Sequence, residues 1–310
     1  MKHKIFIDGQ EGTTGLQLMD RLTARPDIEL LEIDPELRKD STARQAMLNE
    51  AEVAFLCLPD AAAIEAVALA QNKDTIIIDA STAHRTAPGW VYGLPELSPA
   101  QHEAVKISKR IGNPGCHATG MLSIVAPLVA AGIMSADYPV TVHSITGYSG
   151  GGKKMIAQYE DAQRPDSYIS PRQYGLTLKH KHLPEMQAVA GLAVAPIFNP
   201  IVCDFYAGMA VSIPIFTSML TKKMDVAAMT EFFVDHYMGA SFIGVADPPE
   251  DGFLPATLNT GTNKLTLYVC GNADQLTVVS VFDNLGKGAS GAAVQNMNIA
   301  LGLEDNAYLV

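Results

Sequence analysis

A buried strand runs straight into a glycine-rich turn in the stretch Lys4-Ile5-Phe6-Ile7-Asp8-Gly9-Gln10-Glu11-Gly12-Thr13-Thr14-Gly15. We expect a strand over residues 4–8 and a helix that ends at about residue 21. Glycines at such a turn let backbone N–H groups approach a pyrophosphate, which then rests on the helix N-terminus. A tight turn that binds no ligand is the alternative. The predicted dinucleotide contacts are Gly9, Gly12, Thr13, Thr14 and Gly15.

The first third of the chain continues this alternation of strands and helices. Further strands are expected at residues 28–33, 53–58 and 75–79, with helices at 43–49 and 61–70. Helices of this length between strands predict a parallel, doubly wound sheet. Longer strands with polar interruptions follow at residues 140–146, 203–215 and 264–269. The predicted fold class is α/β, with a Rossmann-like domain followed by an α+β domain that contains a mixed sheet.

The composition is that of a globular protein of 310 residues, long enough for two domains. A formal charge of −11 argues against nucleic acid as a partner, because phosphate binding needs a basic face. Apolar stretches stay shorter than the ~18 residues of a membrane span, and the start shows no signal-peptide pattern. The four cysteines lack both metal-site spacing and a disulfide pattern. We therefore expect a cytoplasmic protein with no metal and no membrane partner.

One cysteine lies at the start of an expected helix. The run Gly112-Asn113-Pro114-Gly115-Cys116 cannot continue a regular element, because proline lacks an N–H and glycine permits a tight turn. An apolar helix follows over about residues 118–131. Unpaired N–H groups and the helix dipole lower the pKa of a thiol at such a position and favour a thiolate. The other three cysteines lie in apolar runs, as buried cysteines do, so Cys116 is the predicted nucleophile.

Two further groups of polar residues favour an anionic substrate and acid–base chemistry. Arg85 follows the expected strand 75–79, at the sheet edge where doubly wound proteins bind ligands, and a guanidinium can fork onto a phosphate or carboxylate. The segment His180-Lys181-His182-Leu183-Pro184-Glu185 places two histidines beside a glutamate. One histidine, oriented by Glu185, can move a proton. Which of His180 and His182 does so stays open.

The residues leave the choice between NAD and NADP open. Asp34 follows the second strand, about where an acid that binds the ribose favours NAD. Arg38 and Lys39 come directly after it and can hold a 2′-phosphate. A solvated charged loop is the other interpretation of these two residues.

Several segments together resemble the N-acetyl-gamma-glutamyl-phosphate reductases of the arginine pathway, in the shorter branch of that family. The specific matches are Tyr92-Gly93-Leu94-Pro95-Glu96-Leu97 and Gly112-Asn113-Pro114-Gly115-Cys116. Less specific matches lie at residues 9–15, 79–85, 149–154, 180–185 and 284–298, in the family's order. The sequence departs from the common family pattern at His117 and at Thr82-Ala83-His84.

The resemblance implies NADP(H) as cofactor and a thioester mechanism that reduces N-acetyl-L-glutamyl 5-phosphate, a small anionic acyl phosphate, to the semialdehyde and phosphate. It implies an NADP-binding domain of residues 1–116 plus 286–310, and a catalytic and oligomerisation domain of residues 117–285. The expected oligomer is a homodimer or homotetramer. Cys116 matches the family's nucleophile, His182 or His180 its acid–base histidine, and Arg85 the arginine that binds the substrate phosphate. The other predicted site residues are Glu185 for catalysis, Asn113 and Ser149 for substrate, and Arg38, Gly150, Gly151, Asn284 and Gly288 for the cofactor.

Two alternatives compete with this hypothesis. An aspartate-semialdehyde dehydrogenase would share the architecture and the chemistry on a shorter substrate, but the segment His180–Glu185 argues against it. An NADP-binding regulator without catalysis would have no need of the nucleophile, the arginine and the histidine together.

Overall fold

The computed structural model describes residues 2–310, and these divide into two compact units. The first unit runs to Pro114 and takes up the chain again from Ala289 to Leu309. The second unit consists of Gly115–Gly288 together with Val310.

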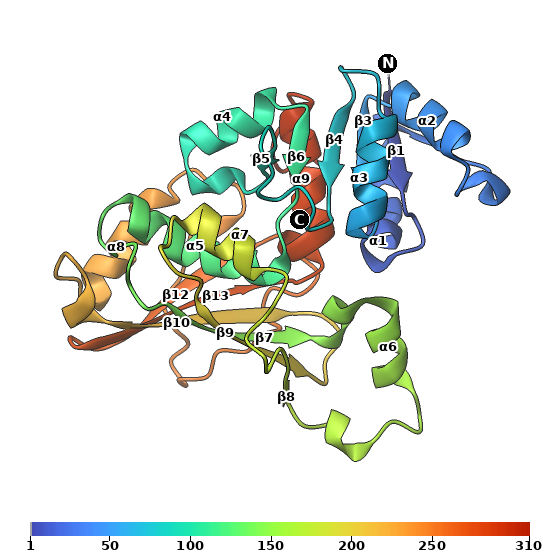
Figure 1. The fold of residues 1–310 in the computed structure, drawn as a ribbon. Helices are drawn as coiled ribbons and strands as arrows, with labels where there is room; N and C mark the ends of the chain where they lie inside the picture. Colours follow the sequence, from blue (N-terminus) through green and yellow to red (C-terminus); the bar gives the residue numbers. More distant parts are fainter. Residues whose placement is uncertain (1) are drawn as a thin grey trace. The chain divides into compact units, whose positions relative to one another are not determined.

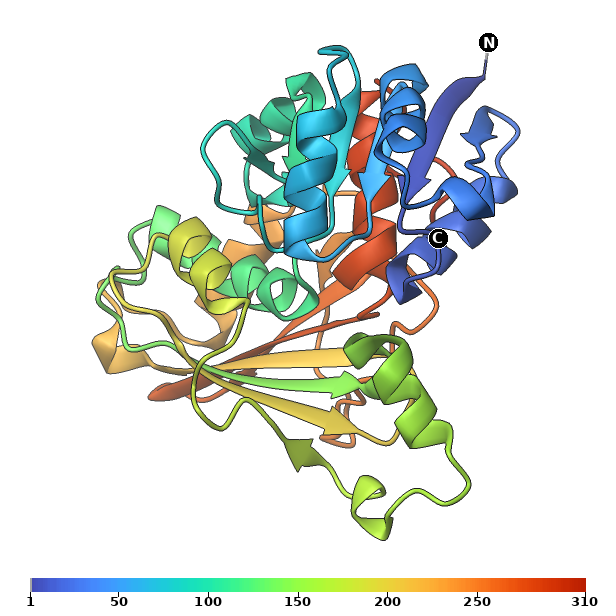
Figure 2. The same ribbon diagram turned by 45° about the vertical axis from the view of Figure 1, so that its right-hand side comes forward.

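Within residues 2–114 and 289–309, six parallel strands form one sheet in the order β2-β1-β3-β4-β6-β5. The strands are β1 (His3–Asp8), β2 (Ile28–Leu31), β3 (Val53–Leu56), β4 (Ile76–Asp79), β5 (Val91–Tyr92) and β6 (Arg110–Gly112). The helices are α1 (Thr13–Thr23), α2 (Ser41–Glu50), α3 (Asp60–Leu69), α4 (Pro99–Ile107) and α9 (Gly291–Ala300). Helices cover both faces of this sheet (Figures 1 and 2). All residues of β3 and β4 are buried, as expected for apolar strands covered on both sides.

The last segment of the chain belongs to the first unit. A short π-helix (Gly286–Ser290) leads into α9, which packs against α4 and β4. Arg25 donates to the side-chain oxygen of Asn298 over 2.7 Å, and Asn296 donates to the carbonyl of Gly93 over 2.9 Å. These buried bonds fasten α9 to the first 114 residues.

Within residues 115–288, a mixed sheet of seven strands has the order β11-β12-β13-β10-β7-β9-β8. The strands are β7 (Thr141–Gly147), β8 (Arg172–Gln173), β9 (Ile197–Cys203), β10 (Met209–Phe216), β11 (Ile243–Val245), β12 (Leu265–Gly271) and β13 (Gln275–Phe282). The helices are α5 (Cys116–Ala130), α6 (Gly152–Glu160), α7 (Leu183–Ala190) and α8 (Val226–His236). Helix α5 packs on β10 and β13, and α8 packs on β11 and β12 (Figure 1). A helix-covered mixed sheet confirms the predicted fold class.

One predicted strand is wrong. The sequence favours a single strand over residues 203–215, but β9 ends at Cys203 and β10 begins at Met209, with β7 between them in the sheet. The intervening turn is fixed by Arg164, which donates to both carboxylate oxygens of Asp204 at 2.6 and 2.7 Å, and by Gly208 at a φ of +127°. The turn contains Phe205 and Tyr206, so in the sequence it looks like part of a continuous apolar strand.

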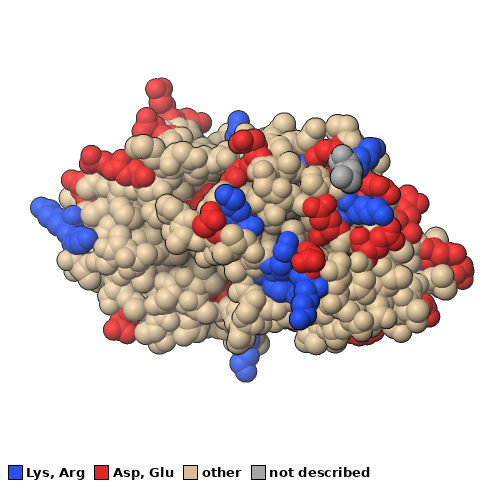
Figure 3. Space-filling model, turned by 90° about the horizontal axis from the view of Figure 1, so that it is seen from above, with Lys and Arg blue, Asp and Glu red and all other residues tan. Residues whose placement is uncertain are grey.

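Basic side chains do not gather into a continuous surface on the face drawn in Figure 3. Lys and Arg form small separate groups there, with Asp and Glu side chains between and around them. The predicted lack of a nucleic-acid partner stays a prediction.

Candidate active site

The glycine turn follows β1 as a tight loop that only glycine can form. Gly9 has a φ of +90°, and a Cβ at this position would overlap the carbonyl of Cys57. A Cβ at Gly15, in the first turn of α1, would in turn overlap the carbonyl of Gly9. Glycine at these two positions therefore allows the loop to lie against the end of β3 and close to the N-terminus of α1.

A cavity of about 390 Å³ opens beside this loop. The hydroxyl of Thr13 is buried and has no hydrogen-bond partner within residues 2–310. A glycine loop with close main-chain N–H groups, next to a buried hydroxyl without a hydrogen-bond partner, is suited to bind a pyrophosphate. The cavity is lined by Ile7, Asp8, Gly9, Gln10, Glu11, Gly12, Ile33, Arg38, Lys39, Cys57, Leu58 and Pro59.

The charged residues after β2 take distinct positions. Arg38 and Lys39 line the cavity, and Arg38 forms an ion pair with Glu11 of the glycine loop. Asp34 instead caps a 3₁₀ turn (Pro35–Leu37), where its side chain accepts the N–H of Glu36 over 2.9 Å. Asp34, the residue that would favour NAD, therefore caps a turn. Arg38 and Lys39, which can bind a 2′-phosphate, line the cavity.

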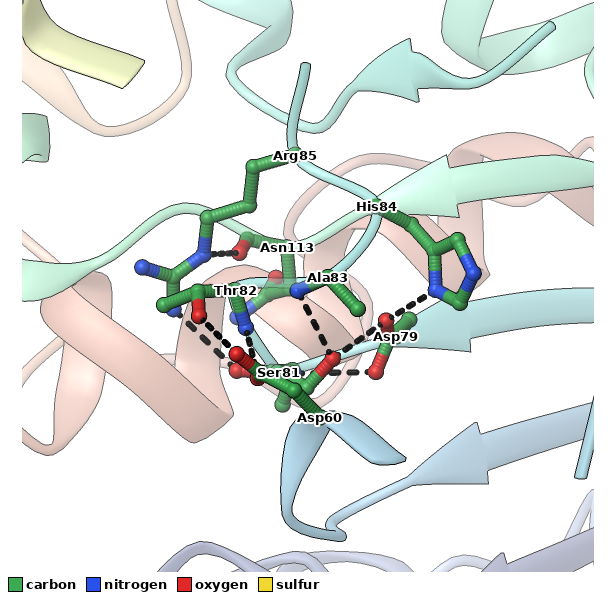
Figure 4. A network of polar contacts seen from close by, with 9 residues as sticks. Asp60, Asp79, Ser81, Thr82, Ala83, His84, Arg85 and Asn113 are labelled. Carbon is green, nitrogen blue, oxygen red and sulfur yellow. Dashed lines mark hydrogen bonds and ion pairs between the residues drawn. The ribbon is translucent and has the colours of Figure 1, made fainter. Parts of the chain in front are cut away.

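Asp79, at the end of β4, organises the loop that leads to Arg85 (Figure 4). Its buried carboxylate accepts the N–H and the hydroxyl of Ser81 at 2.9 and 2.7 Å. The same carboxylate lies 2.6 Å from Nδ1 of His84, whose ring stacks on Trp90 with a centroid separation of 4.2 Å. The loop is therefore folded around one carboxylate.

Arg85 is 8% exposed, and its guanidinium is positioned by main-chain carbonyls. It donates to Asn113 over 3.0 Å and to Ala80 over 3.1 Å (Figure 4). The Asn113 side chain is buried and bonds to the Ala289 carbonyl at 3.0 Å and to the Asn296 amide at 3.2 Å. Asn113 therefore acts on Arg85 through its main chain, while its side chain ties β6 to the start of α9.

Helix α5 begins at Cys116, as predicted. Gly115 is the N-cap in extended geometry and has no side chain to cap the helix, so it satisfies none of the N–H groups of the first turn. A Cβ at Gly288 would lie 2.9 Å from the Cβ of Cys116, so only glycine leaves room there. Cys116 and Cys57 are both partly exposed. Desolvation, with the charges of Asp79 and Asp8, raises the pKa of the Cys57 thiol to about 12.

The histidine segment lies against the start of α5. Glu185, in the first turn of α7, accepts the N–H of Gly115 at 3.1 Å with one carboxylate oxygen. Its other oxygen lies 4.0 Å from Nε2 of His182. The rings of His180 and His182 are 4.8 Å apart, and Nδ1 of His180 accepts the N–H of His182 at 3.2 Å. One buried carboxylate thus connects His182 to the loop before Cys116.

Two hydrogen-bonding partners of His117, the residue after Cys116, were not predicted from the sequence. His117 lies 2.7 Å from the hydroxyl of Ser144 through Nδ1 and 2.8 Å from the hydroxyl of Tyr174 through Nε2. Burial, together with the charges of His180 and Lys181, lowers the pKa of His117 to about 3. Ser144 and Tyr174 carry no local sequence signal that points to this contact.

The remaining predicted contacts lie near the end of β7. Asn284 accepts the N–H of Gly208 at 2.8 Å and donates to the hydroxyl of Ser149 at 3.0 Å. Both the oxygen and the nitrogen of its side-chain amide therefore bond within the protein. Ser149 and Asn284 are both buried. Gly150 and Gly151 lie in the following 3₁₀ turn (Tyr148–Gly151). A Cβ at Gly150 would meet only ordinary contacts at 3.5 Å, whereas one at Gly151 would overlap Met155.

Residues 2–310 contain no group of three or more His, Cys, Asp or Glu side chains arranged to hold a metal ion. Of the helices in this range, none combines the length and apolar character that a membrane crossing requires.

Two family models match most of the chain. The NAD binding domain of semialdehyde dehydrogenase matches residues 32–105, and the semialdehyde dehydrogenase dimerisation domain matches residues 116–284. Among curated proteins, the N-acetyl-gamma-glutamyl-phosphate reductase of Rhizobium meliloti is 46% identical over 308 residues, which cover 97% of this chain and 99% of the relative. The chain belongs to the N-acetyl-gamma-glutamyl-phosphate reductase family.

Other relatives of this reductase family agree. N-acetyl-gamma-glutamyl-phosphate reductase 2 of a Nostoc species is 46% identical and covers 99% of both chains, and the reductase of Brucella ovis is 46% identical over 97% of this chain and all of its own. The predicted resemblance is therefore confirmed, and with it the class of enzyme, an oxidoreductase of the semialdehyde dehydrogenase type.

Solved structures show the same fold at low identity. Aspartate semialdehyde dehydrogenase II of Vibrio cholerae superposes with a TM-score of 0.75 over 97% of this chain and 99% of its own, at 15% identity. The aspartate semialdehyde dehydrogenase of Candida albicans, solved with NADP, gives a TM-score of 0.66 over 96% and 98%, also at 15% identity. These structures support the two-domain fold of the reductase family.

Proposed function

We propose that this chain reduces N-acetyl-L-glutamyl 5-phosphate to N-acetyl-L-glutamate 5-semialdehyde with NADPH, through a thioester on Cys116. The observation that carries the proposal is Glu185, whose carboxylate accepts the N–H of Gly115 and lies 4.0 Å from Nε2 of His182. A nucleophile at a helix N-terminus beside an oriented histidine is the arrangement that acyl transfer through a thioester needs. The relatives at 46% identity bear the name of this reductase.

The chain's own residues account for the acyl-transfer half of the reaction. The Cys116 thiolate attacks the acyl carbon, the carbon–sulfur bond forms, and the acyl–phosphate bond breaks to release phosphate. N–H groups of the first turn of α5 stabilise the tetrahedral oxyanion. After reduction, the carbon–sulfur bond breaks to release the aldehyde and the thiolate, and His182 moves the proton.

The glycine loop is the proposed cofactor site. When bound, NADPH supplies the hydride that no side chain can supply. Gly9, Gly12 and Gly15 shape the cradle for its pyrophosphate, and the buried hydroxyl of Thr13 is placed to donate to it. In this proposal residues 1–116, which end at the nucleophile Cys116, bind the cofactor together with residues 286–310, and residues 117–285 carry His182, Glu185 and the subunit interface.

The test of the function is the reverse reaction. Purified protein should reduce NADP⁺ with N-acetyl-L-glutamate 5-semialdehyde only when inorganic phosphate is present, because phosphate must cleave the thioester. Aspartate semialdehyde serves as the comparison substrate, since the solved neighbours of this fold bear that name. A higher kcat/KM for aspartate semialdehyde would reject the proposal, and a failure to reduce NADP⁺ with either would favour a non-catalytic regulator.

Arg85 is proposed to bind the phosphate of the substrate. Arg85→Lys should lower kcat/KM for the acyl phosphate roughly ten- to a hundredfold, the equivalent of about 1.5–3 kcal/mol for charge-assisted hydrogen bonds. Lysine keeps the charge, but it cannot hold the carbonyls of Ala80 and Asn113 and also present a fork to phosphate. Steady-state kinetics measure the loss, and the Kd for NADPH, by fluorescence titration, should stay within about twofold. A change in NADPH affinity alone would assign Arg85 to the cofactor.

Arg38 is proposed to contact the 2′-phosphate that distinguishes NADPH from NADH. Arg38→Ala should weaken NADPH roughly ten- to a hundredfold more than NADH, because a charge-assisted bond to phosphate contributes about 1.5–3 kcal/mol. The matched control is Glu11→Gln, which removes the ion-pair partner of Arg38 and should strengthen NADPH binding. Titration of both variants with both cofactors measures the ratio. Equal use of NADH and NADPH by the unmodified protein would contradict the assignment.

The second unit is proposed to join subunits into a homo-oligomer, in line with the dimerisation domain that it matches. Ile145 and Phe216 are 37% and 54% exposed and lie on the sheet face that also carries Ala210. Light scattering should find a dimer or tetramer, and Ile145→Asp should shift it toward the monomer. A monomeric unmodified protein at micromolar concentration would reject this interface. The cytoplasmic location also stays a prediction.

A further inference from the structure

A buried ion pair joins α2 to the end of β1. Nε and Nη2 of Arg44 donate to the same carboxylate oxygen of Asp8 at 3.1 and 2.9 Å, and both side chains are 7% exposed. Nη1 of Arg44 lies 3.4 Å from the carboxylate of Glu65 in α3. Asp8 and Gly9, the first residue of the glycine loop, line the cofactor cavity, whereas Arg44 is not one of the residues, within 2–310, that line it. An effect of Arg44 on a ligand in this cavity is therefore indirect.

Main-chain hydrogen bonds connect Arg44 to the turn that carries Arg38 and Lys39. The N–H of Arg44 donates to the carbonyl of Asp40 at 3.0 Å, and the N–H of Asp40 donates to the carbonyl of Leu37 at 2.9 Å. The second of these bonds closes a turn around Arg38 and Lys39, the two cations that line the cavity. A displacement of Arg44 therefore displaces this turn with it.

Few other polar side-chain contacts hold the segment 34–44 in place. Within residues 2–310, the side chains of this segment that hydrogen-bond or ion-pair outside it are those of Arg38, with Glu11, and of Arg44, with Asp8 and Glu65. Nε of Arg38 is buried without a hydrogen-bond partner in the same range, as suits a guanidinium that binds phosphate. When a phosphate replaces Glu11 as the partner of Arg38, the buried contact that still fixes the segment is the pair of Arg44 with Asp8.

We propose that Arg44 is a positioning residue for cofactor specificity, whose ion pair with Asp8 holds Arg38 where it meets the 2′-phosphate of NADPH. The inference rests on the proposed NADPH site. Because Asp8 is followed directly by Gly9, the pair fixes the turn relative to the loop that is proposed to hold the pyrophosphate. Without the pair the turn takes up more positions, so a smaller fraction of molecules presents Arg38 correctly and the apparent affinity falls by that fraction.

The test compares two nucleotides that differ only in the 2′-phosphate, ADP-ribose 2′-phosphate and ADP-ribose, by titration calorimetry of the whole protein. Arg44→Met should lower the preference for the 2′-phosphate about tenfold, while the Kd for ADP-ribose stays within about threefold. Burial already raises the pKa of the Asp8 carboxyl, so without Arg44 this group can take up a proton instead of staying a buried anion. An unchanged preference in Arg44→Met would overturn the inference.

The matched control is Arg25→Met, which also removes a buried guanidinium from an ion pair. Arg25 is 4% exposed and pairs with Asp27 at 2.7 Å, and it bonds to Asn298 of α9 instead of α2. This variant should lower the melting temperature but keep the preference within about twofold. An equal loss of preference in Arg25→Met would attribute the effect to general destabilisation and reject the role of Arg44.

The conservative variant Arg44→Lys keeps the charge beside Asp8. A single ammonium cannot reproduce the two bonds that Nε and Nη2 make, so the preference should fall about threefold. Where Arg44→Met does not fold, Arg44→Lys decides, and a preference equal to that of the unmodified protein would reject the inference.

Action through the two cations is tested in a protein that lacks both. In the background Arg38→Ala with Lys39→Ala, Arg44→Met should change the preference less than about twofold, because no cation is left to position. A further tenfold loss in that background would contradict a positioning role. Equal affinity of the unmodified protein for both nucleotides would reject the NADPH site itself, whereas a preference lost in Arg38→Ala and kept in Arg44→Met would reject only the role of Arg44.

Discussion

Cys116→Ser should abolish turnover while NADPH still binds with nearly unchanged affinity. The serine hydroxyl ionises far less readily than a thiol, so the first step loses its nucleophile. We expect kcat to fall by about three orders of magnitude or more, the range seen when a covalent nucleophile is removed. The assay is phosphate-dependent NADP⁺ reduction, with fluorescence titration for cofactor affinity.

The control for this variant is Cys57→Ser. Cys57 lines the cofactor cavity, and burial raises the pKa of its thiol to about 12, so it has no nucleophilic role in the proposal. It should keep most of the turnover while changing cofactor affinity slightly. Activity of Cys116→Ser above about a hundredth of the unmodified rate would reject the covalent mechanism.

Local signals made much of the fold predictable. Lys4–Asp8 is a continuous run of residues suited to a buried strand, and Gly9 and Gly15 mark the turn because other residues cannot take their places. The start of α5 at Cys116 was predictable because Pro114 and Gly115 end the preceding element within the sequence itself. Such features need no information about distant residues.

Features set by distant residues could not be predicted. The turn between β9 and β10 depends on Arg164 and Asp204, which are 40 positions apart in the sequence. The partners of His117 lie 27 and 57 positions away, at Ser144 and Tyr174. A local sequence pattern carries no information about such contacts, so the sequence predicts a nucleophile at Cys116 but not the groups around its neighbour His117.

The position of Glu185 distinguishes the proposed roles of His180 and His182. It was predicted to orient a histidine, and in the structure it lies 4.0 Å from His182 while its other oxygen accepts the N–H of Gly115. His180 instead bonds to the main chain of His182 and packs its ring edge-on against Phe198 at 5.0 Å. We therefore propose that His182 transfers the proton and that His180 has a supporting role.

His182→Gln should lower kcat roughly a hundred- to ten-thousandfold, the usual contribution of a positioned acid–base group. The same change at His180 should cost less than about tenfold, because a hydrogen-bonding side chain there suffices. Glu185→Gln keeps an acceptor for Gly115 but loses the negative charge beside His182, so its loss should lie between the two. The pH dependence of kcat/KM separates the roles: the limb contributed by the histidine should vanish in His182→Gln and persist in His180→Gln. If it vanished only in His180→Gln, His180 would be the acid–base residue, and Glu185 would serve to hold the loop before Cys116.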